Sequence, residues 1–130
     1  MKRVLIVCPH FPPVNAPDMH RVRMSIQFFP QFGWEPIILA VDSKFSNFPT
    51  EPDLMQTLGA EVEVHRAAAL PVAMTRMLGV GDLGLRSFWY AYRLGSQLLC
   101  QRKIDLTCYD SRFPVCTILP IACRLGIEKQ

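Results

Sequence analysis

The stretch Arg3-Val4-Leu5-Ile6-Val7-Cys8 decides the fold class of this chain. Its apolar residues form a continuous run instead of alternating with polar ones, and β-branched side chains are common in it. A run of this kind is typical of a central parallel strand whose two faces are both covered by helices. The sequence therefore predicts a strand over residues 3–8 that lies inside a parallel sheet.

Strands and helices are expected to alternate along the rest of the chain. Further strands are predicted at 35–41, 61–65 and 104–108, and the alternating pattern of 61–65 is typical of a strand near a sheet edge. Helices are predicted from Asp18 to Pro30, and over 51–58, 86–102 and 115–125. This order predicts an α/β domain, a Rossmann-like doubly wound parallel sheet with strand order 3-2-1-4.

Local signals predict how the helices begin, end and face the core. Asp18 is expected to cap the first helix, and Gly33 is expected to end the helical segment after Pro30. The long helix has two faces. Phe88, Tyr92, Gly95 and Leu99 are predicted to lie on one face, and Arg86, Tyr90, Arg93 and Gln97 on the other, polar face.

The composition excludes several classes of protein. The chain has 130 residues, of which 50% are hydrophobic and 19% are charged, as expected of one globular domain. A net charge of +3 is too small to indicate nucleic-acid binding. No Gly-x-Gly-x-x-Gly follows the first predicted strand, which argues against a dinucleotide-dependent oxidoreductase.

The cysteines do not indicate a covalent or metal framework. The five cysteines include no CxxC pair, so neither a disulfide framework nor a zinc site is expected. Most of them have apolar neighbours and are predicted to be small core residues: Cys8, Cys108, Cys116 and Cys123.

Several motifs, taken in order, resemble a known family. They are Pro9-His10-Phe11-Pro12-Pro13, Ala16-Pro17-Asp18-Met19-His20-Arg21, Phe32-Gly33-Trp34-Glu35-Pro36, Ser111-Arg112-Phe113-Pro114 and Arg124-Leu125-Gly126-Ile127. This series is similar to the N-terminal domain of the family 4 glycosyltransferases, which have the GT-B fold. The resemblance covers nearly the whole chain.

The resemblance implies that residues 1–130 are the N-terminal, acceptor-side domain of a retaining glycosyltransferase. Such enzymes transfer a sugar from a nucleotide-sugar donor to an acceptor hydroxyl in the cleft between two Rossmann-like domains. The C-terminal donor-binding domain is absent from this sequence, which ends where a further strand is expected. We therefore expect a truncated half of a GT-B fold that is inactive alone. The donor is a substrate held mainly by the missing domain, and neither a cofactor nor a metal ion is implied.

Residues that follow the carboxyl ends of strands are the candidate acceptor-binding residues, because ligands of open α/β sheets sit there. His10 and Ser111 lie in the loops after the first and fourth predicted strands, and Pro17 shapes the first of these loops. His20 and Arg21 begin the first helix, where a helix N-terminus and a guanidinium favour an anion. Ordinary alternatives are a solvated helix start, a loop histidine bonded to the backbone and, for Ser111, a turn. No catalytic residue is predicted.

Positive charge concentrates in residues 66–103, which contain six basic residues and Asp82 as the one acidic residue. Apolar residues such as Met74, Met77 and Trp89 are interleaved with these charges. Two interpretations follow. The segment contacts a membrane surface, which would make a cytoplasmic protein peripheral to the membrane, or it is an insertion that packs on the sheet or on the missing domain.

A second function is compatible with the same sequence. A non-catalytic Rossmann-like binding module would use the same loops but would work with a separate partner chain. The expected partners are a small-molecule or glycan acceptor and the missing C-terminal domain, and not nucleic acid.

Overall fold

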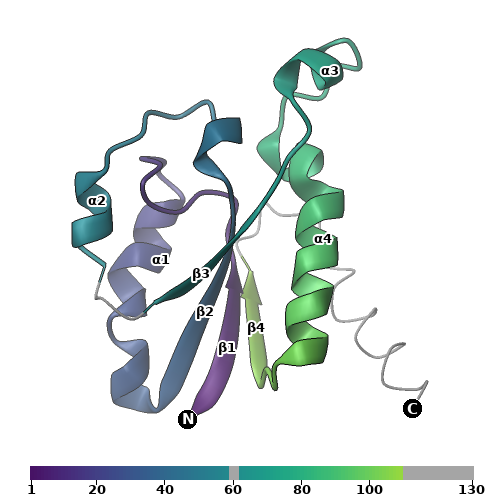
Figure 1. Ribbon diagram of the computed structural model, residues 1–130. Helices are drawn as coiled ribbons and strands as arrows, with labels where there is room; N and C mark the ends of the chain where they lie inside the picture. Colours follow the sequence, from purple (N-terminus) through teal and green to yellow (C-terminus); the bar gives the residue numbers. More distant parts are fainter. Residues whose placement is uncertain (59–61, 110–130) are drawn as a thin grey trace.

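The computed structural model describes residues 1–58 and 62–109, which form a parallel sheet between helices (Figure 1). The strands are β1 (Lys2–Val7), β2 (Trp34–Val41), β3 (Glu63–Ala67) and β4 (Leu106–Tyr109). They lie in the order β3-β2-β1-β4, and all three strand pairs are parallel. The predicted α/β fold and strand order are confirmed, with element ends that differ by one to two residues for most strands.

The apolar run of β1 is buried on both faces, as its pattern predicts. Leu5 and Val7 belong to a core cluster on one side of the sheet, together with α4 residues such as Ala91 and Leu98. Val4 and Ile6 belong to a second cluster on the other side, which includes Ile26 of α1. Because successive side chains of a strand point to opposite faces, a strand with two covered faces needs apolar residues at every position.

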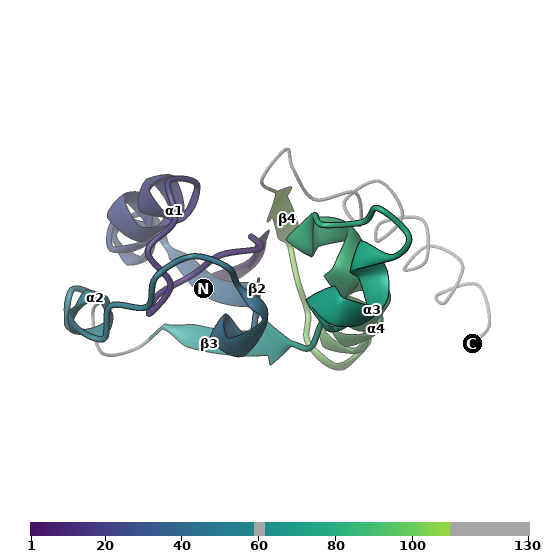
Figure 2. The same cartoon turned by 90° about the horizontal axis from the view of Figure 1, so that it is seen from above.

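The helices cover the two faces unequally. They are α1 (Met19–Ile26), α2 (Asp53–Gln56), α3 (Val72–Arg76) and α4 (Leu83–Gln101), with short 3₁₀ helices at Phe29–Phe32 and Ser43–Phe45. Figure 2 shows α1 and α2 on one side of the sheet and α4 on the other. In Figure 1, α3 stands above the carboxyl edge of the sheet, at the top of α4.

The first helix begins after Asp18 as predicted, but it lacks the capping hydrogen bond and ends earlier than predicted. Asp18 precedes α1, but its side chain makes no capping hydrogen bond and instead contacts His10. The α-helix ends at Ile26, and Pro30 lies in the 3₁₀ helix that follows. Gly33 then ends the helical segment as predicted, with a φ of 76° that a side chain would strain. Asp18 thus occupies the predicted N-cap position, but its carboxylate lies within hydrogen-bond distance of the His10 imidazole and does not accept from a backbone N–H of α1.

Arg86 is the largest difference on α4. It was expected on the polar face with Tyr90, Arg93 and Gln97, which are exposed, but only 2% of its surface is exposed. Its Nη1 donates to the Leu70 carbonyl at 3.1 Å, and its Nη2 donates to the Phe45 carbonyl at 3.0 Å. Helical periodicity misplaces Arg86 because the segments that bury it come from other parts of the chain.

The apolar face of α4 lies against the core, as predicted. Phe88, Tyr92 and Leu99 pack against the core on the α4 side, and Gly95 is buried. Cys8 is buried as predicted, whereas Cys108 is half-buried.

The predicted helix 115–125, together with Ser111, Cys116 and Cys123, lies outside the described residues. Among the helices that the structure describes, none has the length and apolar content needed to cross a bilayer.

Replacing Leu5 by Ala tests the central position of β1. We expect the free energy of unfolding to fall by about 2–5 kcal/mol, because Leu5 is fully buried and its truncation leaves a cavity. Urea unfolding followed by circular dichroism measures the loss. Leu78→Ala is the matched control, since Leu78 is 79% exposed and should change stability by less than about 0.5 kcal/mol. Equal losses in the two variants would contradict the described core.

Replacing Arg86 by Met tests the two carbonyl contacts. Met removes both donors from the Phe45 and Leu70 carbonyls, so we expect a loss of about 1–3 kcal/mol in the same unfolding experiment. Arg93→Met is the control on the exposed face of the same helix, with an expected change within about 0.5 kcal/mol. If the Arg86 variant were as stable as the Arg93 variant, the buried guanidinium would not hold these loops.

Candidate functional site

A pocket of about 270 Å³ opens where the loops after β1 and β2 meet the beginning of α4. We call it the strand-end pocket. The loop after β1 contributes His10, Pro17 and Asp18, the loop after β2 contributes Asn47 and Phe48, and the start of α4 contributes Asp82, Gly84 and Arg86. This position matches the general rule that ligands of open parallel sheets bind beyond the carboxyl ends of the strands.

The loops after β1 and β2 form one continuous wall. Val14 and Thr50 form an antiparallel bridge, and the Asn15 N–H donates to the Pro49 carbonyl at 2.9 Å. The Glu51 N–H donates to the Pro13 carbonyl at 2.7 Å, and the Asn15 side-chain amide donates to the Glu51 carboxylate at 2.8 Å. These bonds hold two loops from different parts of the sequence in one arrangement.

The guanidinium of Arg66, on β3, contacts the loop that follows β1. Arg66 Nη2 donates to the Pro12 carbonyl, while its buried Nη1 has no partner among the described residues. Burial lowers the pKa of Arg66 from its ordinary value, and the nearby Asp42 and Cys8 act in the opposite direction. Arg66 does not line the pocket, so we assign it a supporting role in loop structure.

The side chains of His10 and Asp18 form a hydrogen-bonded pair in the pocket wall. The His10 Nδ1 lies 2.8 Å from Asp18 Oδ2, and each side chain is 12% exposed. The Phe48 ring meets the imidazole edge to face, with ring centroids 5.0 Å apart and planes at 82°. Packing on one side and a carboxylate on the other therefore fix the imidazole plane.

The beginning of α4 supplies the opposite side of the pocket. The Asp82 carboxylate accepts a hydrogen bond from the Gly84 N–H at 3.1 Å and so caps the helix. Arg86 lies one turn further on, and its buried Nε has no hydrogen-bond partner among the described residues. Two carboxylates, Asp18 and Asp82, thus share the pocket with one buried guanidinium.

This mixture is suited to hydroxyl groups. The carboxylates accept hydrogen bonds, the Asn47 amide both donates and accepts them, and the Phe48 ring offers an apolar surface. The part of the chain that the structure describes contains no group of three His, Cys, Asp or Glu residues able to hold a metal ion. The groups that line the pocket are therefore mainly hydrogen-bonding groups beside one aromatic ring.

Only part of the predicted site comes together in this pocket. His10 and Pro17 line it, whereas His20 is half-buried and Arg21 exposed on α1, and neither lines it. Ser111 lies outside the described residues. Sequence reasoning missed Asn47, Phe48, Asp82 and Arg86. The Asp82-x-Gly84 pair at a helix start was a visible capping signal, but nothing in the sequence indicates that it faces His10.

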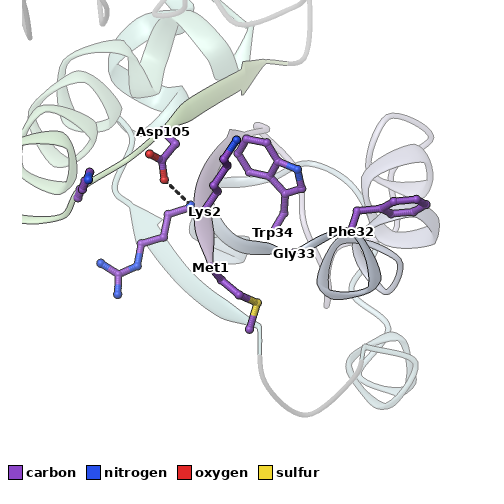
Figure 3. A pocket seen from close by; sticks show the side chains of 8 residues that line it. Met1, Lys2, Phe32, Gly33, Trp34 and Asp105 are labelled. Carbon is purple, nitrogen blue, oxygen red and sulfur yellow. Dashed lines mark hydrogen bonds between the residues drawn. The ribbon is translucent and has the colours of Figure 1, made fainter.

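A larger hollow at the opposite edge of the sheet is a weaker candidate. This space has a volume of about 740 Å³ and lies at the amino ends of the strands, beside Lys2, Trp34 and Asp105, whose side chains Figure 3 labels. Two of its polar side chains already have partners: Lys2 Nζ lies 5.6 Å from the Trp34 ring centroid, and the Asp105 carboxylate accepts from the Arg3 backbone N–H at 2.8 Å. The strand-end pocket has the better position and the more varied set of polar groups.

Comparisons with known proteins add no assignment. No protein-family model matches the chain, and searches of curated proteins and of solved structures also gave no match. The fold and the chemistry of the strand-end pocket are therefore the basis for assigning a function.

Proposed function

We propose that this chain is the acceptor-binding part of a glycosyltransferase, with the strand-end pocket as the place where the hydroxyl-bearing acceptor binds. Three observations support the proposal: the parallel α/β sheet, the position of the pocket at the carboxyl edge, and its lining by His10, Asp18, Asn47, Phe48 and Asp82. The last of these carries the most weight, because function follows from the site and not from the fold.

The pocket's charges favour a neutral acceptor group over a phosphate. Asp18 and Asp82 both line it, and two carboxylates repel an anion bound in the same pocket. Arg21, the residue expected to hold an acceptor anion, is exposed on α1 and does not line the pocket. Sugar or polyol hydroxyls both donate and accept hydrogen bonds, so they suit carboxylates, an amide and an imidazole together.

The size of the pocket limits what it holds. Ligand pockets in proteins commonly measure about 300–1,000 Å³, and this one is slightly smaller. It therefore accommodates a single sugar or polyol ring, with any larger part of the acceptor outside. In the family that the sequence resembles, the groups that assist diphosphate departure come from the C-terminal domain, so we expect no sugar transfer by this chain alone.

A non-catalytic binding module remains the alternative, because the same pocket would bind a ligand without any transfer. The two functions differ in what a partner adds. A glycosyltransferase gains transfer activity when a donor-binding domain is supplied, whereas a binding module gains none.

The α3 region supports an additional contact with a membrane surface. Met74, Met77 and Leu78 are strongly exposed around α3, and Trp89 is exposed on α4. Arg76 lies on α3, Arg93 lines a hollow on α4 together with Trp89, and both arginines are exposed. Exposed apolar side chains with neighbouring cations are the combination that binds an anionic bilayer surface. These methionines are exposed and do not pack on the sheet, so core packing does not account for them.

Ligand binding by the isolated chain tests the proposed acceptor site. We expect methyl α-D-glucoside or myo-inositol to shift backbone amide resonances of the pocket loops in NMR titrations, and inorganic phosphate not to do so. Asn47→Ala should weaken this binding about 5–10-fold through a lost hydrogen bond, and Gln56→Ala, an exposed amide outside the pocket, should not.

The same samples test the absence of transfer. Incubation with a panel of nucleotide sugars should yield no glycosylated product. Binding of phosphate at the pocket in place of the polyols would refute the neutral-acceptor assignment.

Vesicle sedimentation tests the membrane contact. We expect the chain to bind vesicles of phosphatidylcholine with phosphatidylserine better than phosphatidylcholine alone. A double variant, Met77→Ser with Leu78→Ser, should lower binding roughly tenfold or more, since each side chain contributes about 1.5 kcal/mol or more when buried. Met24→Ser is the control, because Met24 is 63% exposed on α1, on the other side of the sheet. Equal binding by all three proteins would exclude α3 as the contact.

A further inference from the structure

The amino edge of the sheet carries aromatic and basic side chains that take no part in the strand-end pocket. An apolar groove of about 360 Å³, which we call the aromatic groove, is lined by Ser25, Phe28, Phe29, Phe32 and Trp34. The hollow of about 740 Å³ beside Lys2 shares Phe32 and Trp34 with this groove. In Figure 3, Trp34 lies between Lys2 and Phe32. We call the groove and the hollow together the amino-edge surface.

The aromatic groove has a fixed floor and an exposed rim. Phe29 and Trp34 are partly buried and pack against the core cluster on the α1 side of the sheet. Phe28 and Phe32 are 48% and 77% exposed. Exposed apolar patches with a polar border are typical of protein interaction sites, and aromatic side chains are enriched in such sites. The groove is therefore suited to an apolar side chain of a partner.

The neighbouring hollow has an excess of positive charge. Lys2, Arg3 and Lys103 line it together with one carboxylate, that of Asp105. This carboxylate accepts the Arg3 backbone N–H, and the Arg3 guanidinium pairs with Glu35. Among the residues that the structure describes, no carboxylate lies within ion-pair distance of the Lys2 or Lys103 ammonium. The two lysines therefore favour a partner that brings carboxylates.

Backbone hydrogen bonds hold the parts of this surface in place. The Lys2 N–H donates to the Gly33 carbonyl at 3.1 Å, which joins the start of β1 to the turn before β2. The Asp105 N–H donates to the Arg3 carbonyl at 2.9 Å, which joins β1 to the segment before β4. A surface held in this way loses little conformational freedom when a partner binds.

We propose that the amino-edge surface binds an acidic, amphipathic segment of a partner protein. An apolar side chain of the segment enters the aromatic groove, and carboxylates beside it face Lys2 and Lys103. This site lies at the edge of the sheet opposite to the strand-end pocket, so the inference goes beyond the proposed function and does not depend on it.

The shape and the charge of the surface favour this partner over two others. Both hollows are concave, and a groove receives the side chains of a peptide segment better than it meets a flat bilayer. A symmetric contact with a second copy of the chain would bring the same lysines toward each other, and like charges repel.

Peptide selection tests the chemistry of the partner. A random peptide library displayed on phage and panned against the immobilised chain should enrich sequences in which an aromatic or branched apolar residue is flanked by Asp or Glu. A fluorescein-labelled peptide with the consensus of these sequences should bind the chain in fluorescence polarisation. Its affinity should fall as sodium chloride is added, because salt screens exposed charges.

Single substitutions locate the binding. Phe32→Ser and Lys103→Glu should each lower the affinity for the peptide roughly tenfold or more, as the loss of a central aromatic or charge-pair contact does. Lys44→Glu is the matched charge control, because the Lys44 Nζ also lies over an aromatic ring, 5.1 Å from the Phe45 centroid, but follows the carboxyl end of β2. Met55→Ser, at a side chain 44% exposed, is the apolar control. Both controls should bind the peptide as the unchanged chain does, and circular dichroism shows that each variant is folded.

Each outcome decides the proposal. Selected peptides without acidic enrichment, or with the same affinity for the Phe32→Ser and Lys103→Glu variants as for the unchanged chain, overturn it. Failure to select any peptide overturns it as well. Binding to vesicles of phosphatidylcholine with phosphatidylserine that is lost in Phe32→Ser would assign the surface to a membrane instead. A dimer in analytical ultracentrifugation that is lost in the same variant would assign it to a second copy.

Discussion

The burial of β1 on both faces is the constraint from which the rest of the structure follows. Val4, Leu5 and Val7 are fully buried, so the strand needs a neighbour on each side and helices above and below it. β2 and β4 supply the neighbours, and α1 and α4 supply the two covers. Because the strands are parallel, the loops that follow them all lie at the carboxyl edge, and the strand-end pocket forms between two of these loops and the start of α4.

A buried cation then fixes how those loops meet. The guanidinium of Arg86 binds one carbonyl from the loop after β2 and one from the segment after β3, which joins both to the first turns of α4. A planar group with several donors in fixed directions is suited to this bridging, and a lysine ammonium would lack that geometry. The same residue is part of the pocket lining, so the fold and the site depend on one side chain.

The sheet was predictable from sequence because its signal is local and repeated. In a continuous apolar run such as Val4–Val7, every residue favours a buried strand. The order of the strands then follows from a few topological rules. The residues that line the pocket were not predictable, because contacts between loops distant in sequence bring them together. The sequence predicts that Asp18 caps a helix, but its carboxylate is hydrogen-bonded to His10, eight residues earlier in the chain. Arg86 had a polar-face pattern but is covered by segments centred on Phe45 and Leu70.

The bridge between Val14 and Thr50 has a consequence for how the site adapts to different ligands. With the bonds of Asn15 and Glu51 beside it, the bridge makes two of the three pocket walls a single preformed body. A preformed wall costs little ordering entropy when a ligand binds, but it also cannot reshape itself. Adjustment is left to the third wall, residues 81–84 before and within the first turn of α4, where Gly81 has open space beside its backbone. Divergence in ligand selectivity would accordingly concentrate in that short segment, while the paired loops retain their sequence.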